Sequence, residues 1–223
     1  MKKDPIGDRM KKNYENRART YLTRRTPVII RLDGKDFHTL TRDCEKPFDD
    51  RFGWAMQKTG SMLVHLIQGC LCAYVQSDEI SLLLTDYRRF NTDYNLQKIV
   101  SVSAAMATAY FNEYYDSDRI AFFDSRAFNL PREEVNNYFV WRQKDWIRNS
   151  VQMMGQAHFS HRELQNKSCS DIHEMLHSKG LNWAHLPSRW KNGSFITKGC
   201  KDCQHMFQQC PQVIENLLQQ EEE

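Results

Sequence analysis

Two short acidic turns carry the residues of this chain that are best suited to chemistry. Asp33 follows the apolar run at 28–32, and Asp78 and Glu79 lie between two further apolar runs. In many proteins such an Asp is simply a turn residue. Two such turns in one chain instead predict that the carboxylates meet at the edge of a sheet. Because Mg²⁺ bound with substrate phosphates is commonly held by one or two carboxylates, this pattern indicates metal-dependent phosphoryl transfer.

The elements around these turns must bring the carboxylates together. Apolar periodicity and turn residues predict, in chain order, a strand at 27–32, a helix that Asp49 or Asp50 caps and Gly69 ends, a hairpin at about 70–85, a helix at about 94–115 and a strand at 120–124. This is the order of the split βαβ, ferredoxin-like fold, which nucleotide polymerase palms and class III cyclases use. The first strand and the hairpin are neighbours in that fold, so Asp33 is expected beside Asp78.

The rest of the chain is expected to form helices and loops around this core. We predict a basic helix at about 5–22, a polar loop at 33–48, a charged loop at 86–93, helices from Pro131 to about 178 and a small hairpin at 190–196. The predicted fold class is α+β: a ferredoxin-like polymerase or cyclase palm, with an antiparallel sheet and helices packed on one face, plus a helical C-terminal region. We place the palm at 1–130, the helical and hairpin region at 131–198, and a tail of unknown role at 199–223.

Composition limits the classes to which the chain can belong. Of its 223 residues, 40% are hydrophobic, which allows a sizeable core, and the net charge of +3 is mild. Residues 1–25 are rich in Lys and Arg, a basic arm that suits a phosphate-rich polymer or is simply a solvated helix face. No apolar run is long enough to span a bilayer, and no secretory signal precedes the core. Seven scattered cysteines argue against a disulfide framework, so we expect a reduced, cytoplasmic protein with no membrane partner.

Several stretches of the chain resemble a known family. The pairing of Asp-Gly-x-x-Phe-His with Gln-Ser-Asp-Glu, in this order, is specific, whereas either motif alone is weak. The chain is similar in these residues to the tRNA-histidine guanylyltransferase family, and more closely to its bacterial-type, Thg1-like branch of 3′–5′ polymerases. The resemblance runs from about residue 8 to about residue 198. Its matching stretches are 14–17, 31–38, 46–47, 76–79, 123–126, 141–143 and 148–150.

The resemblance implies a nucleotidyltransferase that adds nucleotides to the 5′ end of tRNA, opposite in direction to ordinary polymerases. ATP first activates the 5′-monophosphate of the RNA, and the 3′-hydroxyl of an incoming nucleoside triphosphate then attacks it. Both steps are in-line phosphoryl transfers, in which positioning and cations supply most of the catalysis. The resemblance also implies two Mg²⁺ ions, ATP, GTP and other nucleoside triphosphates as substrates, and a homotetramer.

The resemblance assigns roles to the matching positions of this chain. It implies that Asp33 and Asp78 are catalytic, metal-binding carboxylates, that the Gly34 carbonyl is a further metal ligand, and that Glu79 supports the site. The implied nucleotide-binding residues are Gly34, Lys35, Asp36, Phe37 and His38, whose amides would cradle a triphosphate, together with Ser77 and the phosphate-binding Lys46 and Lys98. The implied RNA-binding residues are Arg126, Arg142, Arg148 and Asn149. Without the family, Gly34 is a turn glycine, His38 a loop histidine and Lys46 a surface lysine.

The chain departs from the family just after Trp141-Arg142-Gln143. The tRNA-histidine enzymes carry His-Ile-Asn-Asn shortly after this motif, and here Ile147 replaces the histidine while Asn149 keeps its type. Ile147 can neither donate a hydrogen bond nor carry charge. This favours the branch that repairs truncated tRNAs, in which the opposite strand selects the nucleotide, over guanylate addition to tRNA-histidine. The alternatives are a nucleotide cyclase, which would need a Gly-Gly-Asp/Glu-Glu-Phe hairpin or a paired-subunit base-recognition set, and a non-catalytic RNA-binding module.

Two further groups of residues have more than one interpretation. The helical region carries Tyr138, Trp141, Arg142, Trp146 and Arg148, which would clamp RNA ends or else form a core stripe or a subunit interface. The tail carries Cys200, Cys203, His205 and Cys210, which resemble half of a zinc site. Because a structural zinc needs four ligands, we expect ordinary reduced cysteines there.

Overall fold

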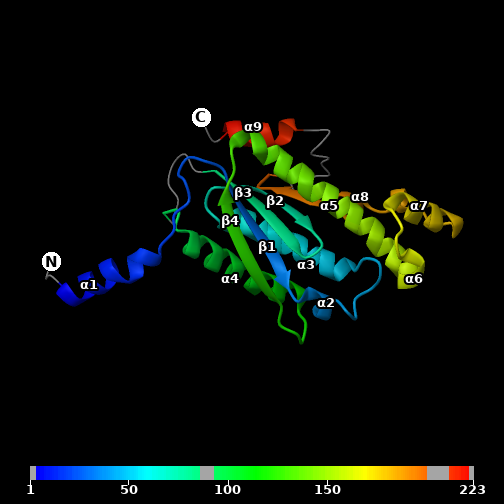
Figure 1. Ribbon diagram of the computed structural model, residues 1–223, viewed down its shortest axis with the longest axis horizontal. Helices are drawn as coiled ribbons and strands as arrows, with labels where there is room; N and C mark the ends of the chain where they lie inside the picture. The colour runs from blue at the N-terminus through cyan, green and yellow to red at the C-terminus, as the bar shows by residue number, and fades with distance from the viewer. Residues whose placement is uncertain (1–3, 86–92, 200–210, 221–223) are drawn as a thin grey trace.

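The centre of the molecule is one antiparallel sheet. The computed structural model describes residues 4–85, 93–199 and 211–220. Within them, five strands lie in the order β4-β1-β3-β2-β5 (Figure 1). Their bounds are β1 Val28–Lys35, β2 Cys70–Gln76, β3 Glu79–Leu84, β4 Phe122–Asn129 and β5 Ser194–Thr197. Because β1 pairs with both β3 and β4, and β3 pairs with β2, the predicted ferredoxin-like arrangement of the first four strands is confirmed.

Two helices cover one face of the sheet, as the pattern predicts. They are α3 (Asp50–Leu66), which Asp49 caps, and α4 (Leu96–Tyr115). Alternate strand residues point to this face, and Ile30 and Leu32 are buried in its core. Phe37, just after β1, packs against Phe111 of α4 and Phe123 of β4, with ring centroids 5.3 and 5.0 Å apart. This aromatic contact anchors the chain where β1 ends.

The other face of the sheet is apolar at one end and polar at the other. The helix α5 (Arg132–His158) crosses it, and α9 (Gln212–Gln220) packs near the start of α5 (Figure 1). Ile29 and Leu83 form a second core with Phe139 of α5. The next residues of β1 on this face are Arg31 and Asp33, so the face becomes charged toward the end of the strand. The carboxylates therefore lie at its polar end.

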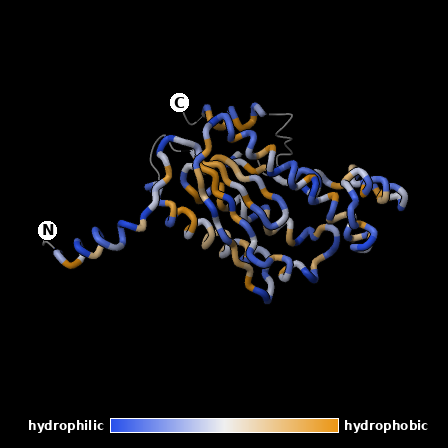
Figure 2. The backbone as a smooth tube through the Cα atoms, viewed as in Figure 1, coloured by the Kyte–Doolittle hydropathy of each residue, from blue (hydrophilic) through white to orange (hydrophobic). Residues whose placement is uncertain are grey.

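Shorter elements complete the described chain. The helix α1 (Pro5–Asn13) and the 3₁₀ turn η1 (Glu15–Ala18) contain no buried residue, and α1 projects from the body as an arm (Figure 1). The others are α2 (Phe37–Leu40), α6 (His161–Leu164), α7 (Cys169–Ser178), η2 (Trp183–His185) and α8 (Ser188–Asn192). Figure 2 shows hydrophobic residues gathered in the central sheet. The arm lies outside this core, so packing does not hold it.

Several predicted elements differ from those observed. The helix expected at 5–22 ends at Asn13, because the chain beyond it forms the turn η1 and then an extended bridge between Tyr21 and Asn95. The strand expected at 120–124 runs from Phe122 to Asn129, and the loop expected at 33–48 contains the end of β1 and all of α2. The hairpin expected at 190–196 is wrong: α8 is followed by the single strand β5, which pairs with β2. Local pattern shows that a segment is extended but not which sheet edge is open to it. No described helix combines the length and apolar character needed to cross a membrane.

Candidate active site

The two acidic turns lie together at one end of the sheet. Asp33 of β1 is the antiparallel partner of Glu79 in β3 and of Asp124 in β4, so these three side chains share one face. The Gly34 amide donates a hydrogen bond of 3.1 Å to the Asp78 carbonyl oxygen. This bond joins the end of β1 to the β2–β3 turn, and it places Asp33 and Asp78 on adjoining segments.

A two-residue turn, Ser77 and Asp78, joins β2 to β3. Ser77 has a φ of 46°, in the left-handed region. Tight hairpin turns require such values, which cost energy for a residue that has a side chain. The neighbouring strands hold the turn in this conformation, and conformations of this kind concentrate at functional sites.

Both carboxylates lie where the fold disfavours negative charge. Burial raises the pKa of Asp33, and the charges of Glu79 and Asp124 raise it further. Burial also raises the pKa of Asp78, and the charge of Asp33 adds to the effect. A cation bound between the two side chains would reverse this balance, because it stabilises their ionised forms.

The oxygen donors at this end of the sheet fit Mg²⁺. Asp33 and Asp78 offer carboxylates and Gly34 offers a carbonyl, which are the ligand types that hard cations prefer. Among the described residues, no group of three or more His, Cys, Asp and Glu side chains is arranged to hold a metal. Mg²⁺ keeps water and phosphate ligands and needs only one or two carboxylates, so the pair is a sufficient protein contribution.

A cavity of about 270 Å³ opens beside the Asp78 turn. Ser77 and Asp78 line it, and aromatic rings form another part of its wall. Phe48 stacks on Trp190 with ring centroids 5.0 Å apart and planes 8° from parallel, and Trp146 meets Phe48 edge-on. A concave apolar surface with a few polar groups is the usual form of a small-molecule site.

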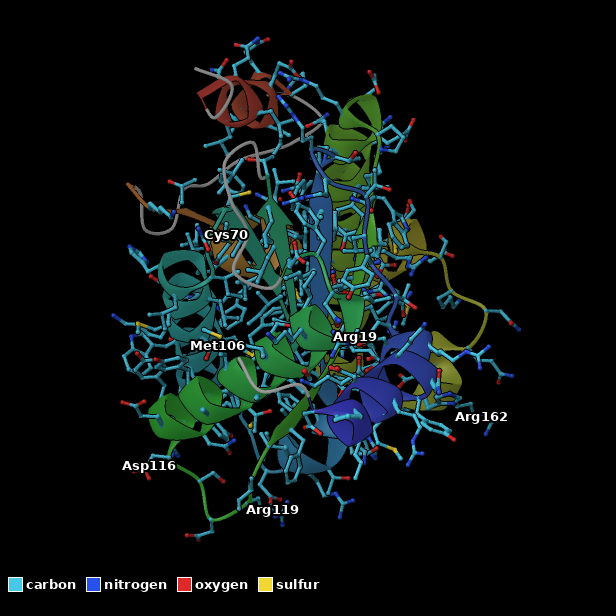
Figure 3. The ribbon with its side chains drawn as sticks, turned by 90° about the vertical axis from the view of Figure 1, so that its left-hand side faces the viewer. Arg19, Cys70, Met106, Asp116, Arg119 and Arg162 are labelled. Atoms are coloured by element: carbon cyan, nitrogen blue, oxygen red, sulfur yellow. The ribbon has the colours of Figure 1, made fainter. Side chains whose placement is uncertain are left out.

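Close packing explains why residue 34 is glycine. A Cβ at Gly34 would lie 2.5 Å from the ring of Phe37, which is itself 3% exposed in the core. Only glycine lets this ring fold back against the end of β1, and α2 begins with Phe37. Arg119, in the α4–β4 connection, donates a hydrogen bond of 2.9 Å to the Thr39 carbonyl and ties α2 down (Figure 3).

Known proteins share this sheet and these motifs. A family model described as tRNAHis guanylyltransferase (Thg1) matches residues 7–131. The chain belongs to the tRNA(His) guanylyltransferase family. Members of this family are tRNA nucleotidyltransferases, so the chain is an enzyme of that class.

Solved structures and curated sequences agree with this family assignment. A bacterial Thg1-like protein in complex with ATP is 42% identical, with a TM-score of 0.90 over 96% of this chain and 99% of that one. Another such structure, in complex with GTP, is 40% identical, with a TM-score of 0.84 over the same shares. The tRNA(His) guanylyltransferase of Kluyveromyces lactis is 28% identical over 77% of this chain and 82% of that protein.

The cavity gathers only some of the nucleotide-binding residues that membership of the Thg1 family implies. Phe37, His38, Lys46 and Ser77 line it, together with Asp78, which is implied as a metal ligand. The Lys46 ammonium donates a hydrogen bond of 2.9 Å to the Thr41 carbonyl. Lys35 and Asp36 are exposed just before α2, and the Gly34 amide is engaged by Asp78 rather than open to a triphosphate. Lys35 is the last residue of β1 and pairs with Phe122 of β4, so the amides beyond the strand are those of residues 36–38.

Lys98 lies apart from this cavity. It is exposed near the start of α4 and borders a different surface hollow, together with Arg19 and Tyr21. Figure 3 shows Arg19 near this end of α4, at the base of the arm. The structure therefore groups Lys98 with the basic arm rather than with the residues around Asp78.

The residues expected to bind RNA divide into exposed and buried ones. Arg126, Arg148 and Asn149 are exposed, on β4 and α5. Arg142 differs, because its side chain faces the sheet and the residue is only 8% exposed. An RNA contact needs an accessible guanidinium, so the geometry does not support that role for Arg142. Its partner is Glu79, which is also 8% exposed.

The structure adds Phe48 and Trp190 to the cavity, which the sequence did not indicate, and places Trp146 beside them rather than at a predicted RNA contact. The aromatic wall of Phe48, Trp146 and Trp190 comes from three separate segments, and no local pattern links them. Asp124 pairs with Asp33 across β1 and β4. It lies in the stretch 123–126 that matches the family, and this match could have identified it from the sequence. The cysteines and histidine of the tail, residues 200–210, lie outside the described residues.

Proposed function

We propose that this chain is a template-dependent 3′–5′ nucleotidyltransferase that restores missing nucleotides at the 5′ end of tRNA. In this proposal ATP activates the 5′-monophosphate, and the 3′-hydroxyl of an incoming nucleoside triphosphate attacks the activated phosphate. One observation carries the proposal: an aromatic cavity opens directly beside the Asp78 turn, at the end of the sheet that also bears Asp33. Nucleotide and carboxylates would then meet at one place.

The lining of the cavity supports the binding of a nucleoside triphosphate. Phe48 and Trp190 offer ring faces, and stacking on such rings tolerates any base. Lys46 and Ser77 supply a cation and a hydroxyl for the polar part of the ligand. The ATP and GTP complexes of bacterial Thg1-like proteins, 42% and 40% identical to this chain, support the same use here.

Asp33 and Asp78 would hold two Mg²⁺ ions, with the Gly34 carbonyl as a further ligand. Bound ions supply positive charge to the attacking and leaving oxygens of an in-line transfer. The residues of the chain do the positioning: Lys46 would orient phosphate, and the amides of residues 36–38 lie at the start of α2. Arg126, Arg148 and Asn149 are accessible for contacts with the RNA.

Residue 147 favours 5′-end repair over guanylate addition to tRNA-histidine. Ile147 stands where the tRNA-histidine enzymes carry a histidine, and an aliphatic side chain reads neither charge nor hydrogen bonds. Selection of the nucleotide would then fall to base pairing with the opposite strand. The homotetramer and the cytoplasmic location that we expect from the sequence stay predictions.

The test uses a 5′-monophosphorylated tRNA that lacks its first nucleotide. The RNA is incubated with the enzyme, ATP, all four nucleoside triphosphates and Mg²⁺, and product length is read on a sequencing gel. We expect growth by one residue that matches the template. Asp78→Asn, which keeps the shape but not the charge, should lower this activity by at least a hundredfold, because a transition-state charge loses its stabilisation.

A full-length tRNA-histidine lacking its extra 5′ guanylate is the matched substrate. Extension of this RNA alone would overturn the repair proposal in favour of guanylate addition. Extension of neither RNA by a folded enzyme would return the cyclase and the RNA-binding module to consideration. Full turnover by folded Asp78→Asn would remove Asp78 from the metal site.

A further inference from the structure

A buried ion pair joins α5 to the hairpin of β2 and β3, which carries Asp78 in its turn. The Arg142 guanidinium donates from Nε to Glu79 Oε1 over 2.8 Å and from Nη2 to Glu79 Oε2 over 2.7 Å. The two side chains are 9% and 10% exposed. Two parallel bonds of this kind fix the orientation of both groups, not only their separation. Arg142 lies beyond residues 7–131, the part that the family model matches.

Glu79 is fully engaged within the protein. Besides Arg142, its Oε1 accepts hydrogen bonds from Gln76 Nε2 at 3.2 Å and from Ser81 Oγ at 3.1 Å. The Ser81 hydroxyl in turn lies 2.7 Å from the Tyr138 hydroxyl of α5. A carboxylate held in this way by its own sheet and by α5 serves as an anchor, which leaves metal binding to Asp33 and Asp78.

The ion pair continues from the interior to the surface of α5. Arg142 Nη2 also donates to Asp145 Oδ2 over 3.1 Å, and the exposed Arg148 pairs with the other oxygen of Asp145. The Arg142 guanidinium lies over the ring of Trp141, 4.6 Å from its centroid, and Trp141 is 53% exposed. Negative and positive side chains alternate from Glu79 through Arg142 and Asp145 to Arg148, so each of these charges has an opposite charge beside it.

We propose that Arg142 is a positioning residue for the reaction: it fixes Glu79, and thereby the adjoining Asp78 turn, in the arrangement that binds metal. The inference rests on the proposed function, since it concerns the same carboxylates. The turn is short and strained at Ser77, so its shape depends on the residues that hold each side. Gln76 and Glu79 are the paired residues that flank it, and both are tied into the Arg142 network. The helix beyond the palm thus completes the metal site without contacting metal or nucleotide.

The experiment compares Arg142→Met and Arg142→Lys with wild type. Arg142→Met keeps the length of the side chain and removes its charge, whereas Arg142→Lys keeps the charge and loses the paired geometry. Gln143→Met is the matched control, because Gln143 is the next residue of α5, is also buried, and donates to the Asn192 carbonyl. The readouts are Mn²⁺ binding followed by electron paramagnetic resonance with ATP present, the Mg²⁺ dependence of kcat, and the Kd for tRNA.

We expect Arg142→Met to weaken Mn²⁺ binding and to raise the Mg²⁺ concentration for half-maximal activity by at least tenfold. Its Kd for tRNA should stay within twofold of the wild-type value. Arg142→Lys should recover part of the metal affinity, and Gln143→Met should match wild type. Unchanged metal binding with a weaker Kd for tRNA would overturn the proposal and make Arg142 an RNA contact. Unchanged values in all three measurements would overturn it as well.

Folding is kept separate from positioning by a second variant. Arg142→Met leaves Glu79 as an unpaired buried charge, which destabilises a fold. The double variant Glu79→Gln with Arg142→Met has no such charge, and we expect it to fold while still binding Mn²⁺ at least tenfold more weakly. Wild-type metal affinity in the folded double variant would overturn the proposal. The proposed function requires that wild type binds Mn²⁺ and that Asp78→Asn abolishes this binding. If either result is absent, the proposed function is wrong, rather than the role of Arg142.

Discussion

Asp78 carries a charge that the fold alone disfavours. Burial raises its pKa, and the neighbouring Asp33 charge opposes ionisation further. The hydrogen bond from the Gly34 amide to the Asp78 carbonyl oxygen ties the end of β1 to the turn, and so holds the two acids on adjoining segments. In the proposed function a cation would resolve this conflict, and binding of metal and nucleotide would then recover the cost of placing the two acids together.

This conflict predicts a pH-dependent stability of the metal-free enzyme. The pKa of Asp78 is higher in the folded than in the unfolded chain, so its ionised form destabilises the fold at neutral pH. The penalty disappears as the pH falls through the folded-state pKa. In EDTA at pH 7, Asp78→Asn should therefore unfold at a higher temperature than wild type, and the difference should shrink as the solution is acidified.

Calorimetric scans at several pH values measure this effect. Asp118→Asn, an exposed acid in the α4–β4 connection, is the control and should change little. With Mg²⁺ and ATP added, wild type should gain stability and Asp78→Asn should not, because a ligand stabilises only the protein that binds it. An Asp78→Asn protein less stable than wild type in EDTA at pH 7 would contradict the electrostatic account.

Trp146 carries a buried polar group that lacks a hydrogen-bond partner among the described residues. Its side chain lines the cavity and is 2% exposed, and its indole Nε1 has no hydrogen-bond partner among the described residues. Because Nε1 is itself closed to solvent, we predict that a bound nucleotide shifts the cavity wall and then accepts a hydrogen bond from Nε1. Trp146→Phe should then weaken ATP or GTP binding by about two- to tenfold, since a neutral hydrogen bond contributes about 0.5–1.5 kcal/mol.

Isothermal titration with ATP measures the change. Trp183→Phe is the matched control, because the Trp183 indole donates to Ser150 Oγ at 3.0 Å and does not line this cavity. Equal effects of the two substitutions on nucleotide affinity would count against a direct contact by Trp146.

At the scale of elements, α5 has two separate tasks. Its first half packs on the apolar end of the sheet, where Phe139 is fully buried. Its middle places Arg142 against Glu79 in the β2–β3 hairpin. The described part of α9 adds to the first task only. Ile214 and Leu218 are each 1% exposed in the second core, and Glu215 pairs with Arg132 at the start of α5.

This division predicts that substitutions in α9 lower the stability of the fold but leave the enzymatic activity unchanged. Replacing Ile214 and Leu218 together by Ala should lower the free energy of unfolding by about 2–4 kcal/mol, because two buried aliphatic side chains are lost but a terminal helix can detach. The Mg²⁺ dependence of kcat should stay within twofold of the wild-type value. Denaturant unfolding measures the first effect, with Asn216→Ala on the exposed face of α9 as the control. A changed Mg²⁺ dependence would show that α9 also influences the site.

At the scale of the whole molecule, the buried apolar clusters and the residues proposed for binding and chemistry occupy different regions. Three buried clusters lie between the sheet and α3–α4, between the sheet and α5, and around α7. The carboxylates and the cavity lie at the polar end of the sheet, whereas α1 projects away from the body without a buried residue (Figure 1). The hollow beside Lys98 carries mixed charge, because its Arg19 pairs with Glu15.

The sequence by itself determined the order of the first four strands with α3 and α4, and the positions of the acids, because both depend on local pattern. Asp33 follows the apolar run of β1, Asp78 lies in a two-residue turn, and Asp49 caps a helix, all as the sequence pattern predicts. Only the tertiary structure decided the aromatic wall, the pairing of β5 with β2, and the burial of Arg142. Glu79 and Arg142 are 63 positions apart, and a residue's spacing carries no information about a partner at that separation. An arginine next to a tryptophan resembles an RNA contact until packing shows that it faces the sheet.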